Sequence, residues 1–511
     1  MLPKTTQLVV PEVARSWIIN TYIKTVREKP LVIVTRSVEQ AELLESNLIQ
    51  VNKSIDIEVL PSWESFPLEK ISPQTHIMGK RNKVLWRLRK QEYPDVIIAT
   101  ARSISQVITN QNFESTINIQ NGHELSYEGL IDQLSSFGYK RTTQVERCGE
   151  FSIRGSIIDV YPSTYEAPIR LEMWGDEVER LTTFSTRDQL SKNPLSDAQI
   201  FPASELCITD DVKSRAHELS KEMPWGSTFW EIISEGGTFD GVENLLPWLN
   251  PKRETILDLL PSSALVLLFD AKQIQQRIEN LISEEQSISM MLSETLSPKA
   301  KHGMQTLHIT FEEAFLREKI RTVEINSSSA DLIGPDITVM TPERRITDPL
   351  QILKGLVQDG YNIVLLSEND KSIKALNNKL ALLDLNPVIH SSDSPIEETS
   401  GISLISGVDI SSVIFPELKF AIINERELSR RRQSPRKVKR KSDAPGSTFM
   451  DLKEGAFVVH EHHGIAIFRG IVKRSLADVE RDYLLLEYRK GDKLLSLIHI
   501  SEPTRPERIA D

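Results

Sequence analysis

Three closely spaced histidines, His460, His462 and His463, are the side chains of this 511-residue chain best suited to hold a metal ion. Zinc sites complete a tetrahedron by combining such imidazoles with cysteines or carboxylates. The two cysteines, Cys148 and Cys207, lie far from these histidines and have no metal-type spacing. We therefore interpret the histidines as structural and predict neither a metal site nor a cofactor in this chain.

Nucleotide chemistry would require a glycine-rich turn whose backbone N–H groups approach the phosphates, followed by a lysine and a hydroxyl. No glycine occurs before Gly79, and the pattern Gly-x-x-x-x-Gly-Lys-[Ser/Thr] is absent from the whole chain. Asp176 and Glu177 follow Gly175 in an expected hairpin turn, so they do not resemble a Walker-B carboxylate at the end of an apolar strand. We therefore predict no catalytic residue.

Protein recognition is the chemistry that Arg154, Arg170 and Trp174 suggest. Arg170 and Trp174 lie four apart on a predicted strand and therefore share a face. Arginine beside an aromatic ring is a frequent composition at interface hot spots. In the alternative, the arginine stems only cover a hairpin while their guanidinium groups pair with Glu172 or Asp159.

A basic segment contains nine lysines and arginines among the sixteen positions from Arg426 to Lys441. Such a segment cannot bury enough apolar surface to fold alone, which favours a solvated linker over residues 426–447. The alternative is a salt-sensitive contact with DNA phosphates. It would use Arg430, Arg431, Arg432, Arg436 and Lys437.

Composition is ordinary for a soluble multidomain protein, with 39% hydrophobic and 26% charged residues. A net charge of −11 argues against a chain that binds nucleic acid over its whole surface. No leading apolar stretch or membrane-length apolar run is present. We predict a cytoplasmic protein with no membrane contact.

Three β-branched or apolar runs, Leu31–Thr35, Ala264–Phe269 and Asn362–Leu366, each precede a predicted helix. The expected capping pairs are Ser37 with Gln40, Asp270 with Gln273, and Ser367 with Asp370. The apolar helix stripes are Ala41, Leu44 and Leu48; Ile274, Ile278 and Leu281; and Ile373, Leu376 and Leu380. Such units are typical of doubly wound α/β domains, and Asp95–Thr100 belongs with the first.

Residues 120–205 differ from these units because they carry short strand patterns separated by turn residues such as Gly155 and Gly175. The predicted elements are a helix over Tyr127–Phe137 and strands over Gly149–Ile153, Ser156–Tyr161, Pro168–Met173 and Val178–Phe184. We predict an antiparallel α+β insert that makes the host lobe discontinuous.

Residues 451–488 contain short β-favouring runs punctuated by Gly464 and Gly470, a pattern typical of a small, strongly bent β-barrel. The run from Tyr483 to Leu486 is apolar on both faces of a strand, although a barrel core needs only one. An exposed apolar face indicates a docking surface, formed by a subset of Leu484, Leu485 and Leu486 that the sequence leaves open.

Two parts of the chain resemble bacterial transcription-repair coupling factors. Residues 1 to about 330 resemble the UvrB-homology module, and residues 451–488 resemble the RNA-polymerase-interaction domain, which is related to CarD-type regulators. The segments that carry the first likeness are Leu60–Pro67, Arg81–Leu88, Asp95–Thr100, Gly149–Pro162, Ile169–Arg180 and Gly241–Pro247.

The resemblance implies an α/β multidomain fold with a degenerate P-loop-type lobe, a second small α/β domain and a truncated Tudor/CarD-like barrel. The implied segments are the lobe's first part (1–118), the UvrA-binding insert (119–205), the lobe's second part (206–332), the small α/β domain (333–425), the linker (426–447), the polymerase-interaction domain (448–494) and a non-native tail (495–511).

The implied function is that of an adaptor that docks on stalled RNA polymerase and recruits UvrA for transcription-coupled nucleotide excision repair. Arg154, Arg170 and Trp174 would bind UvrA, whereas Leu484, Leu485 and Leu486 would bind the polymerase β subunit. The ATP- and Mg-dependent translocase motor of the full-length family, its main DNA contact, is expected to be missing. This chain would then be a monomer without enzymatic activity.

Two other functions fit parts of this pattern. A UvrB-type helicase with a degenerate nucleotide site is the first alternative, but it lacks the glycine-lysine loop and a counterpart of the barrel. A CarD-like regulator fused to unrelated domains is the second, and the UvrB-like match over 150–181 counts against it.

The end of the chain departs from the family pattern after Leu494. Residues Leu495 to about Arg505 resemble the translation of a transposase-type sequencing adaptor, which predicts a non-native tail over 495–511. Because 494–500 is β-prone, we expect it to pair with the open edge beside Tyr483–Leu486.

Overall fold

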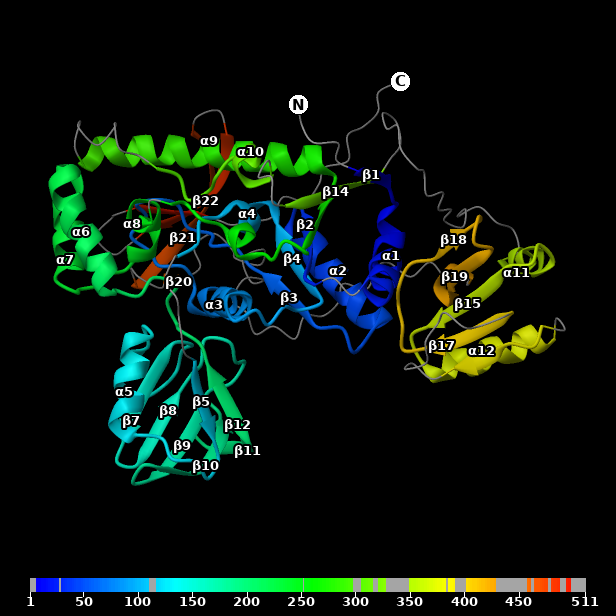
Figure 1. Ribbon diagram of the computed structural model, residues 1–511, viewed down its shortest axis with the longest axis horizontal. Coiled ribbons are helices and arrows are strands. Elements are labelled where there is room, and N and C mark those ends of the chain that lie inside the picture. The colour runs from blue at the N-terminus through cyan, green and yellow to red at the C-terminus, as the bar shows by residue number, and fades with distance from the viewer. Residues whose placement is uncertain are drawn as a thin grey trace. The chain divides into compact units, whose positions relative to one another are not determined.

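The computed structural model shows a mixed α/β protein with both parallel and antiparallel sheets (Figure 1). It describes residues 6–26, 29–109, 116–250, 252–296, 305–315, 320–327, 349–382, 385–390, 401–428, 457–460, 464–476, 479–487 and 493–497. Internal contacts divide the chain into Met1–Arg431 and Arg432–Asp511. No helix in these described ranges is both long and apolar enough to cross a membrane.

A six-stranded parallel sheet with the order β1-β14-β13-β2-β4-β3 forms the first lobe. Its strands are β1 (Thr6–Val9), β2 (Leu31–Thr35), β3 (Ile57–Leu60), β4 (Val96–Thr100), β13 (Leu265–Phe269) and β14 (Arg321–Asn326). Because β13 pairs directly with β2, the lobe is built from two separated parts of the chain, as predicted.

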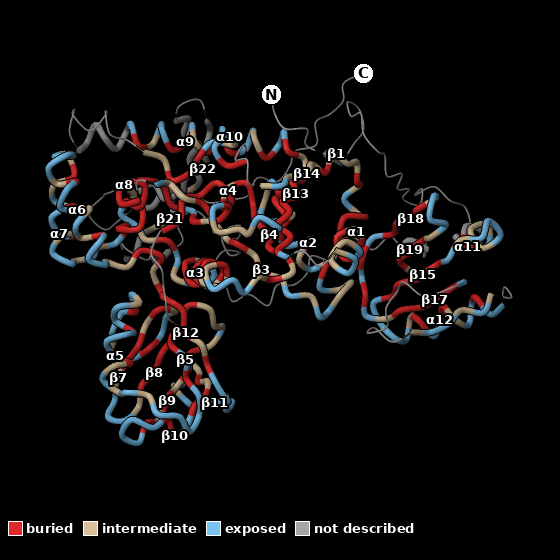
Figure 2. Tube along the Cα trace, viewed as in Figure 1, coloured by how far each residue is buried: buried red, intermediate tan, exposed pale blue. Residues whose placement is uncertain are grey.

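Helices cover both faces of this sheet, so its central strands are buried along their whole length (Figure 2). The helices are α1 (Glu12–Thr25), α2 (Val38–Val51), α3 (Thr75–Arg89), α4 (Ala101–Ser105), α9 (Ala271–Leu296) and α10 (Phe311–Phe315). The predicted apolar stripes of α2 and α9 are buried, which confirms the helix periodicity.

Only one of the three predicted capping pairs is confirmed, that of Ser37, which accepts a hydrogen bond from the backbone N–H of Gln40. The prediction for Asp270 was wrong, because its carboxylate binds Ser327 and Arg15 from distant parts of the chain. The prediction for Ser367 was also wrong, because its hydroxyl donates to the Glu425 carboxylate at 2.6 Å.

The true N-cap of α12 (Asp370–Ala381) is Asn369, which accepts from the backbone N–H of Ser372. This helix covers the second parallel sheet, whose order is β16-β17-β15-β19-β18. Its strands are β15 (Asn362–Ser367), β16 (Val388–His390), β17 (Ile402–Ser406), β18 (Val413–Phe415) and β19 (Phe420–Asn424). Only β18 runs antiparallel to its neighbour. Two further helices are α11 (Pro349–Gln358) and α13 (Glu425–Leu428).

The predicted insert forms a second six-stranded sheet, β11-β10-β9-β8-β7-β6, and a two-stranded sheet, β12-β5. Its elements are β5 (Ile117–Gln120), α5 (Tyr127–Ser136), β6 (Lys140–Arg141), β7 (Glu150–Arg154), β8 (Ile157–Val160), β9 (Ile169–Trp174), β10 (Glu177–Phe184), β11 (Ser191–Pro194) and β12 (Asp197–Ile200). All pairings are antiparallel except β6 with β7, which the sequence pattern did not predict.

Short helices connect the insert to β13. They are α6 (Asp210–Glu222), η1 (Pro224–Gly226), α7 (Ser227–Ser234), η2 (Val242–Leu245), α8 (Leu246–Leu249) and η3 (Ile256–Leu259). Three tryptophans, Trp225, Trp230 and Trp248, pack edge to face here, with ring centroids 5.7–5.8 Å apart.

The second unit contains an antiparallel sheet with the order β20-β21-β22-β23. Its strands are β20 (Phe457–His460), β21 (Gly464–Leu476), β22 (Val479–Glu487) and β23 (Lys493–Leu497). A register shift between Phe468 and Ile471 surrounds Gly470, whose φ of 111° suits only glycine. β23 pairs with β22 as expected for the end of the chain, whereas closure of the sheet into a barrel stays a prediction.

Candidate partner-binding surface

The insert's antiparallel sheet places Arg154, Arg170 and Trp174 on one face. Tight turns at Gly155 (φ 62°) and Gly175 (φ 63°) reverse the chain after β7 and β9. Side chains along β9 alternate between buried and outer positions, so Arg170 and Trp174 share the outer face, as predicted.

The opposite face of this sheet is apolar and forms the core of the insert. It packs against Leu130 and Leu134 of α5. The buried residues of the sheet include Phe151, Ile158, Val160, Ile169, Leu171, Met173, Val178 and Leu181. Because this face is occupied by the core, the outer face is the one available for recognition.

Asp159 on β8 is the centre of the polar cluster on the outer face, and its side chain is fully buried. It lies directly opposite Arg170, whose Nε and Nη2 donate to its two carboxylate oxygens at 2.7 and 3.0 Å. Arg154 donates to the same carboxylate through Nη2. The two-pronged hydrogen bond to Asp159 raises the pKa of Arg170, so its positive charge is secure.

Arg170 is also held from the side away from Asp159. Its Nη1 donates to the backbone oxygen of Gln189 at 3.0 Å, and its guanidinium lies 4.7 Å from the Phe184 ring centre. Only 12% of the Arg170 side chain is exposed. This residue therefore acts as a support rather than as a freely accessible group.

Trp174 is the most accessible member of the three, with 77% of its surface exposed. Arg154 is intermediate, with 46% of its side chain exposed. The predicted alternative of pairing with Asp159 is thus observed for both arginines, whereas Glu172 pairs with Arg180 at 3.7 Å. The surface consists of an exposed indole and one accessible guanidinium on the same sheet face, and a buried carboxylate positions the guanidinium.

Sequence reasoning missed Gln189 and Phe184 as parts of this surface. Gln189 has a left-handed backbone (φ 61°), and its side-chain amide donates to the backbone oxygens of Val145 and Thr186. No local motif predicts the contacts of Gln189 with Arg170 and Val145, because these residues lie 19 and 44 positions away from it in the sequence.

The edge of the first lobe at which a doubly wound fold usually binds nucleotides is occupied by the protein's own side chains. Arg15 of α1 is 3% exposed, and its Nη2 donates to Asp270 at 3.0 Å and to the Ser327 hydroxyl at 2.8 Å. Burial would raise the pKa of Asp270, but the hydrogen bonds from Arg15 and Ser327 and the positive charge of Arg15 together outweigh it, so the pKa is lowered. These three residues follow or adjoin β1, β13 and β14 at their carboxyl ends.

The side chains of the other predicted site residues are not among those that the structure describes. Arg430, Arg431, Arg432, Arg436 and Lys437 of the basic segment lie outside the described residues. Leu484, Leu485 and Leu486 lie in β22, where only the backbone is described. His460 ends β20, and His462 and His463 lie outside the described residues. No group of metal-ligating side chains large enough to hold an ion occurs within the described part of the chain.

Family comparisons place this geometry in context. Residues 117–206 match the UvrB interaction domain, and residues 452–498 match the CarD-like/TRCF RID domain. The fold and the surface thus define a multidomain α/β protein with two interaction domains. The second match extends four residues beyond the boundary predicted at Leu494.

More specifically, the chain is similar to transcription-repair-coupling factors, which confirms the resemblance found in the sequence. It is 27% identical to that of Bacillus subtilis (strain 168) over 498 residues, which cover 91% of this chain and 42% of the relative. Identity to the Mycobacterium tuberculosis factor is 27% over 535 residues (96% and 42%), and to the Haemophilus influenzae factor 25% over 487 residues (91% and 42%). The chain therefore spans about two fifths of the length of these relatives.

Proposed function

We propose that this chain acts as an adaptor in transcription-coupled nucleotide excision repair, as the N-terminal part of a transcription-repair coupling factor. One segment binds RNA polymerase and the other recruits UvrA, so that a stalled polymerase becomes the starting point for repair. The observation that carries this proposal is the exposed Trp174 on the same sheet face as the arginines bound by Asp159, within the residues that match the UvrB interaction domain.

The proposed UvrA contact combines Trp174 and Arg154 at the surface with Arg170 behind them. An exposed indole contributes a large apolar area, and a guanidinium already oriented by a carboxylate loses little conformational freedom on binding. Because Asp159 is buried beneath both arginines, it positions the surface without needing to touch the partner.

The proposed polymerase contact lies in residues 452–498, with the β subunit as the partner and Leu484, Leu485 and Leu486 as its apolar centre. DNA contact, a monomeric state and a cytoplasmic location belong to the same proposal. Adaptor function in these residues needs no ATP hydrolysis, which accords with the missing glycine-lysine loop and with the Arg15–Asp270 pair at the carboxyl edge of the sheet.

Trp174→Ala in the full 511-residue chain tests the UvrA contact. We expect UvrA binding, measured by surface plasmon resonance, to weaken by about 2 kcal/mol or more, because truncated aromatic hot spots usually cost this much. Leu418→Ala is the matched control, since Leu418 is 73% exposed but lies outside the insert. Equal affinities for the wild type and Trp174→Ala would contradict the proposed surface.

ATP turnover tests the non-catalytic part of the proposal. We expect no DNA-stimulated ATP hydrolysis by the purified chain. Robust turnover that a single substitution within residues 1–330 abolishes would instead support a UvrB-type helicase with a degenerate nucleotide site.

A further inference from the structure

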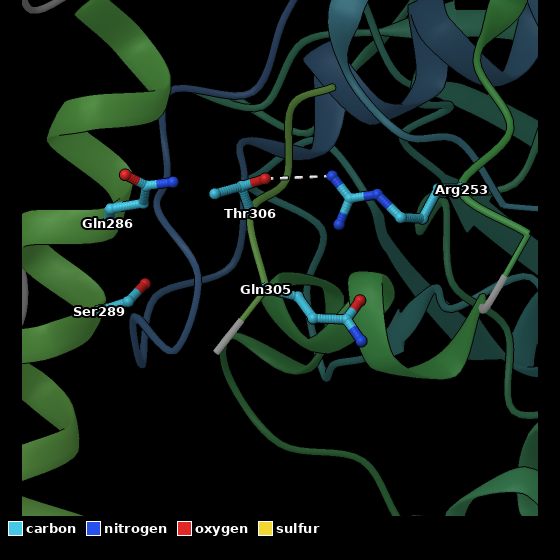
Figure 3. A pocket seen from close by; sticks show the side chains of 5 residues that line it. All are labelled: Arg253, Gln286, Ser289, Gln305 and Thr306. Carbon is cyan, nitrogen blue, oxygen red and sulfur yellow. Dashed lines mark hydrogen bonds between the residues drawn. The ribbon is translucent and has the colours of Figure 1, made fainter. Parts of the chain in front are cut away.

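A polar cavity of about 190 Å³ is lined by residues that belong to neither proposed partner surface. Three separate segments form it, and Figure 3 shows their side chains around the same space. Its lining residues are Arg253 from the turn after α8, Gln286 and Ser289 from α9, and Gln305 and Thr306 from the segment that precedes α10. Gln286 and Ser289 lie three apart on α9 and therefore share one face of the helix.

Arg253 supplies positive charge to this cavity. Its Nη2 donates to the Thr306 hydroxyl and to the backbone oxygen of His308, both at 3.0 Å. Both acceptors are neutral, and no ion pair of Arg253 occurs among the residues that the structure describes. A guanidinium carries five N–H donors, and both bonds use Nη2, so they leave the donors on Nε and Nη1 to a ligand.

The backbone of Arg253 adds a second indication of a built site. Its φ of 49° lies in the left-handed region, which is uncommon for residues with a Cβ. This conformation is stabilised by the hydrogen bond from its backbone N–H to Asn250 and by the two side-chain anchors. Burial lowers the pKa of Arg253, and the charges of Glu313 and Glu285 oppose this shift without forming an ion pair with Arg253 in the described part of the chain.

Ser289 supplies a second, independent polar group to the cavity. It is only 2% exposed, and its hydroxyl has no hydrogen-bond partner among the described residues. Buried hydroxyls in folded proteins nearly always have a partner. In Figure 3 the Ser289 hydroxyl faces the space between α9 and the segment that contains Thr306.

We propose that this cavity binds a small oxyanion of the phosphate type, with Arg253 as its cationic donor and Ser289 as a hydroxyl donor. The described lining residues offer a guanidinium, hydroxyls and amides, with no carboxylate among them, which favours an anion over a metal ion. The volume is below the roughly 300–1,000 Å³ of ordinary small-molecule pockets, so a single phosphate group fits better than a whole nucleotide.

The phosphate group bound in this cavity could be free phosphate or the terminal phosphate of a nucleic acid strand. The inference does not depend on the proposed adaptor function, because none of the cavity residues belongs to the UvrA or polymerase surfaces. It also differs from a nucleotide site at the sheet edge, where Arg15 and Asp270 lie.

The test is calorimetric titration of inorganic phosphate into the full 511-residue chain, with chloride at the same ionic strength as the reference. We expect saturable binding with a dissociation constant of about 1 mM or tighter. Arg253→Gln should weaken it about tenfold or more, and Ser289→Ala roughly two- to tenfold, as lost charged and neutral hydrogen bonds do. Lys252→Gln, an equal charge change at the neighbouring exposed residue, should leave binding unchanged.

Ser289→Ala keeps the test decisive if Arg253→Gln does not fold, because it removes only a hydroxyl without a partner. A 5′-phosphorylated dinucleotide and its unphosphorylated form then identify the source. Tighter binding of the phosphorylated form than of free phosphate would indicate a strand end, and the reverse would indicate the free ion. Absence of phosphate binding, equal binding by Ser289→Ala and the wild type, or equal weakening by Lys252→Gln and Arg253→Gln would overturn the proposal.

Discussion

A fully buried ion pair ties the insert to the first lobe, and its removal should strongly lower the free energy of unfolding. Arg81 of α3 and Glu205, which follows the insert's last strand, both have completely buried side chains. Arg81 donates through Nε and Nη2 to the two carboxylate oxygens of Glu205 at 2.6 and 3.2 Å. Trp63 donates its indole N–H to the same carboxylate at 3.1 Å, and Arg81 also donates to the backbone oxygen of Pro61 at 2.9 Å.

Replacement of Arg81 by Met leaves the Glu205 carboxylate buried, with the Trp63 N–H as its one remaining donor among the described residues. Breaking a buried pair in this way costs about 3–5 kcal/mol of unfolding free energy. The double variant Arg81→Met/Glu205→Leu removes both charges. It should therefore be less destabilised than Arg81→Met alone. The Pro61 oxygen has lost its partner in both variants, so the double variant adds only an unpaired Trp63 N–H, at about 1–3 kcal/mol.

Urea unfolding followed by circular dichroism, with hydrogen exchange of peptides that contain residues 60–66 and 202–206, measures these changes. Arg87→Met is the matched control on the same helix, because Arg87 pairs with Asp56, whose side chain is 47% exposed, while Glu58 keeps Lys83 as a second partner. Pairs of that kind contribute about 0–1 kcal/mol. The reasoning fails if Arg81→Met costs no more than Arg87→Met, or if the double variant is less stable than Arg81→Met.

Three further predictions follow from buried or strained groups. Burial holds the pKa of His308 below its ordinary 6.5 despite Glu285 at 2.6 Å. Below about pH 6.5 the unfolded chain therefore binds a proton that the folded chain does not. The free energy of unfolding should thus decrease as the pH is lowered from about 6.5. Gly241→Ala should destabilise more than Gly155→Ala, because both positions have positive φ but a Cβ at 241 would meet a backbone oxygen at 2.2 Å. The cost at 155, where no atom lies within 4 Å of that Cβ, should be about 1–2 kcal/mol. Asp159→Asn should weaken UvrA binding without changing the exposed residues, because both arginines lose their charged anchor.

Each of these predictions has a direct measurement. Urea unfolding between pH 8 and 5 should give a flatter profile for His308→Gln than for the wild type, and identical profiles would contradict the assignment of a neutral histidine. Thermal unfolding compares the glycine variants, and a larger loss at Gly155 than at Gly241 would show that the close approach does not matter. Surface plasmon resonance measures UvrA binding by Asp159→Asn, for which unchanged affinity would mean that the anchor is irrelevant.

The sequence alone determined the α/β architecture and its main elements. Apolar runs such as 31–35 and the helix stripe of Ala41, Leu44 and Leu48 predict strands and helices because burial repeats with the period of the local backbone. The same reasoning placed Arg170 and Trp174 on one face. The absence of a glycine-lysine loop could likewise be established from the sequence, since that loop is one contiguous motif.

Only the tertiary structure decided which polar groups meet. Asp270 and Ser367 have the local spacing of helix caps, yet their partners come from residues 15, 327 and 425. The support of Arg170 by Gln189 and the cavity lined by Arg253 and Ser289 likewise join distant segments. Hydrogen-bond partners of buried polar groups depend on which elements pack together, whereas periodicity reports only which side of each element is buried.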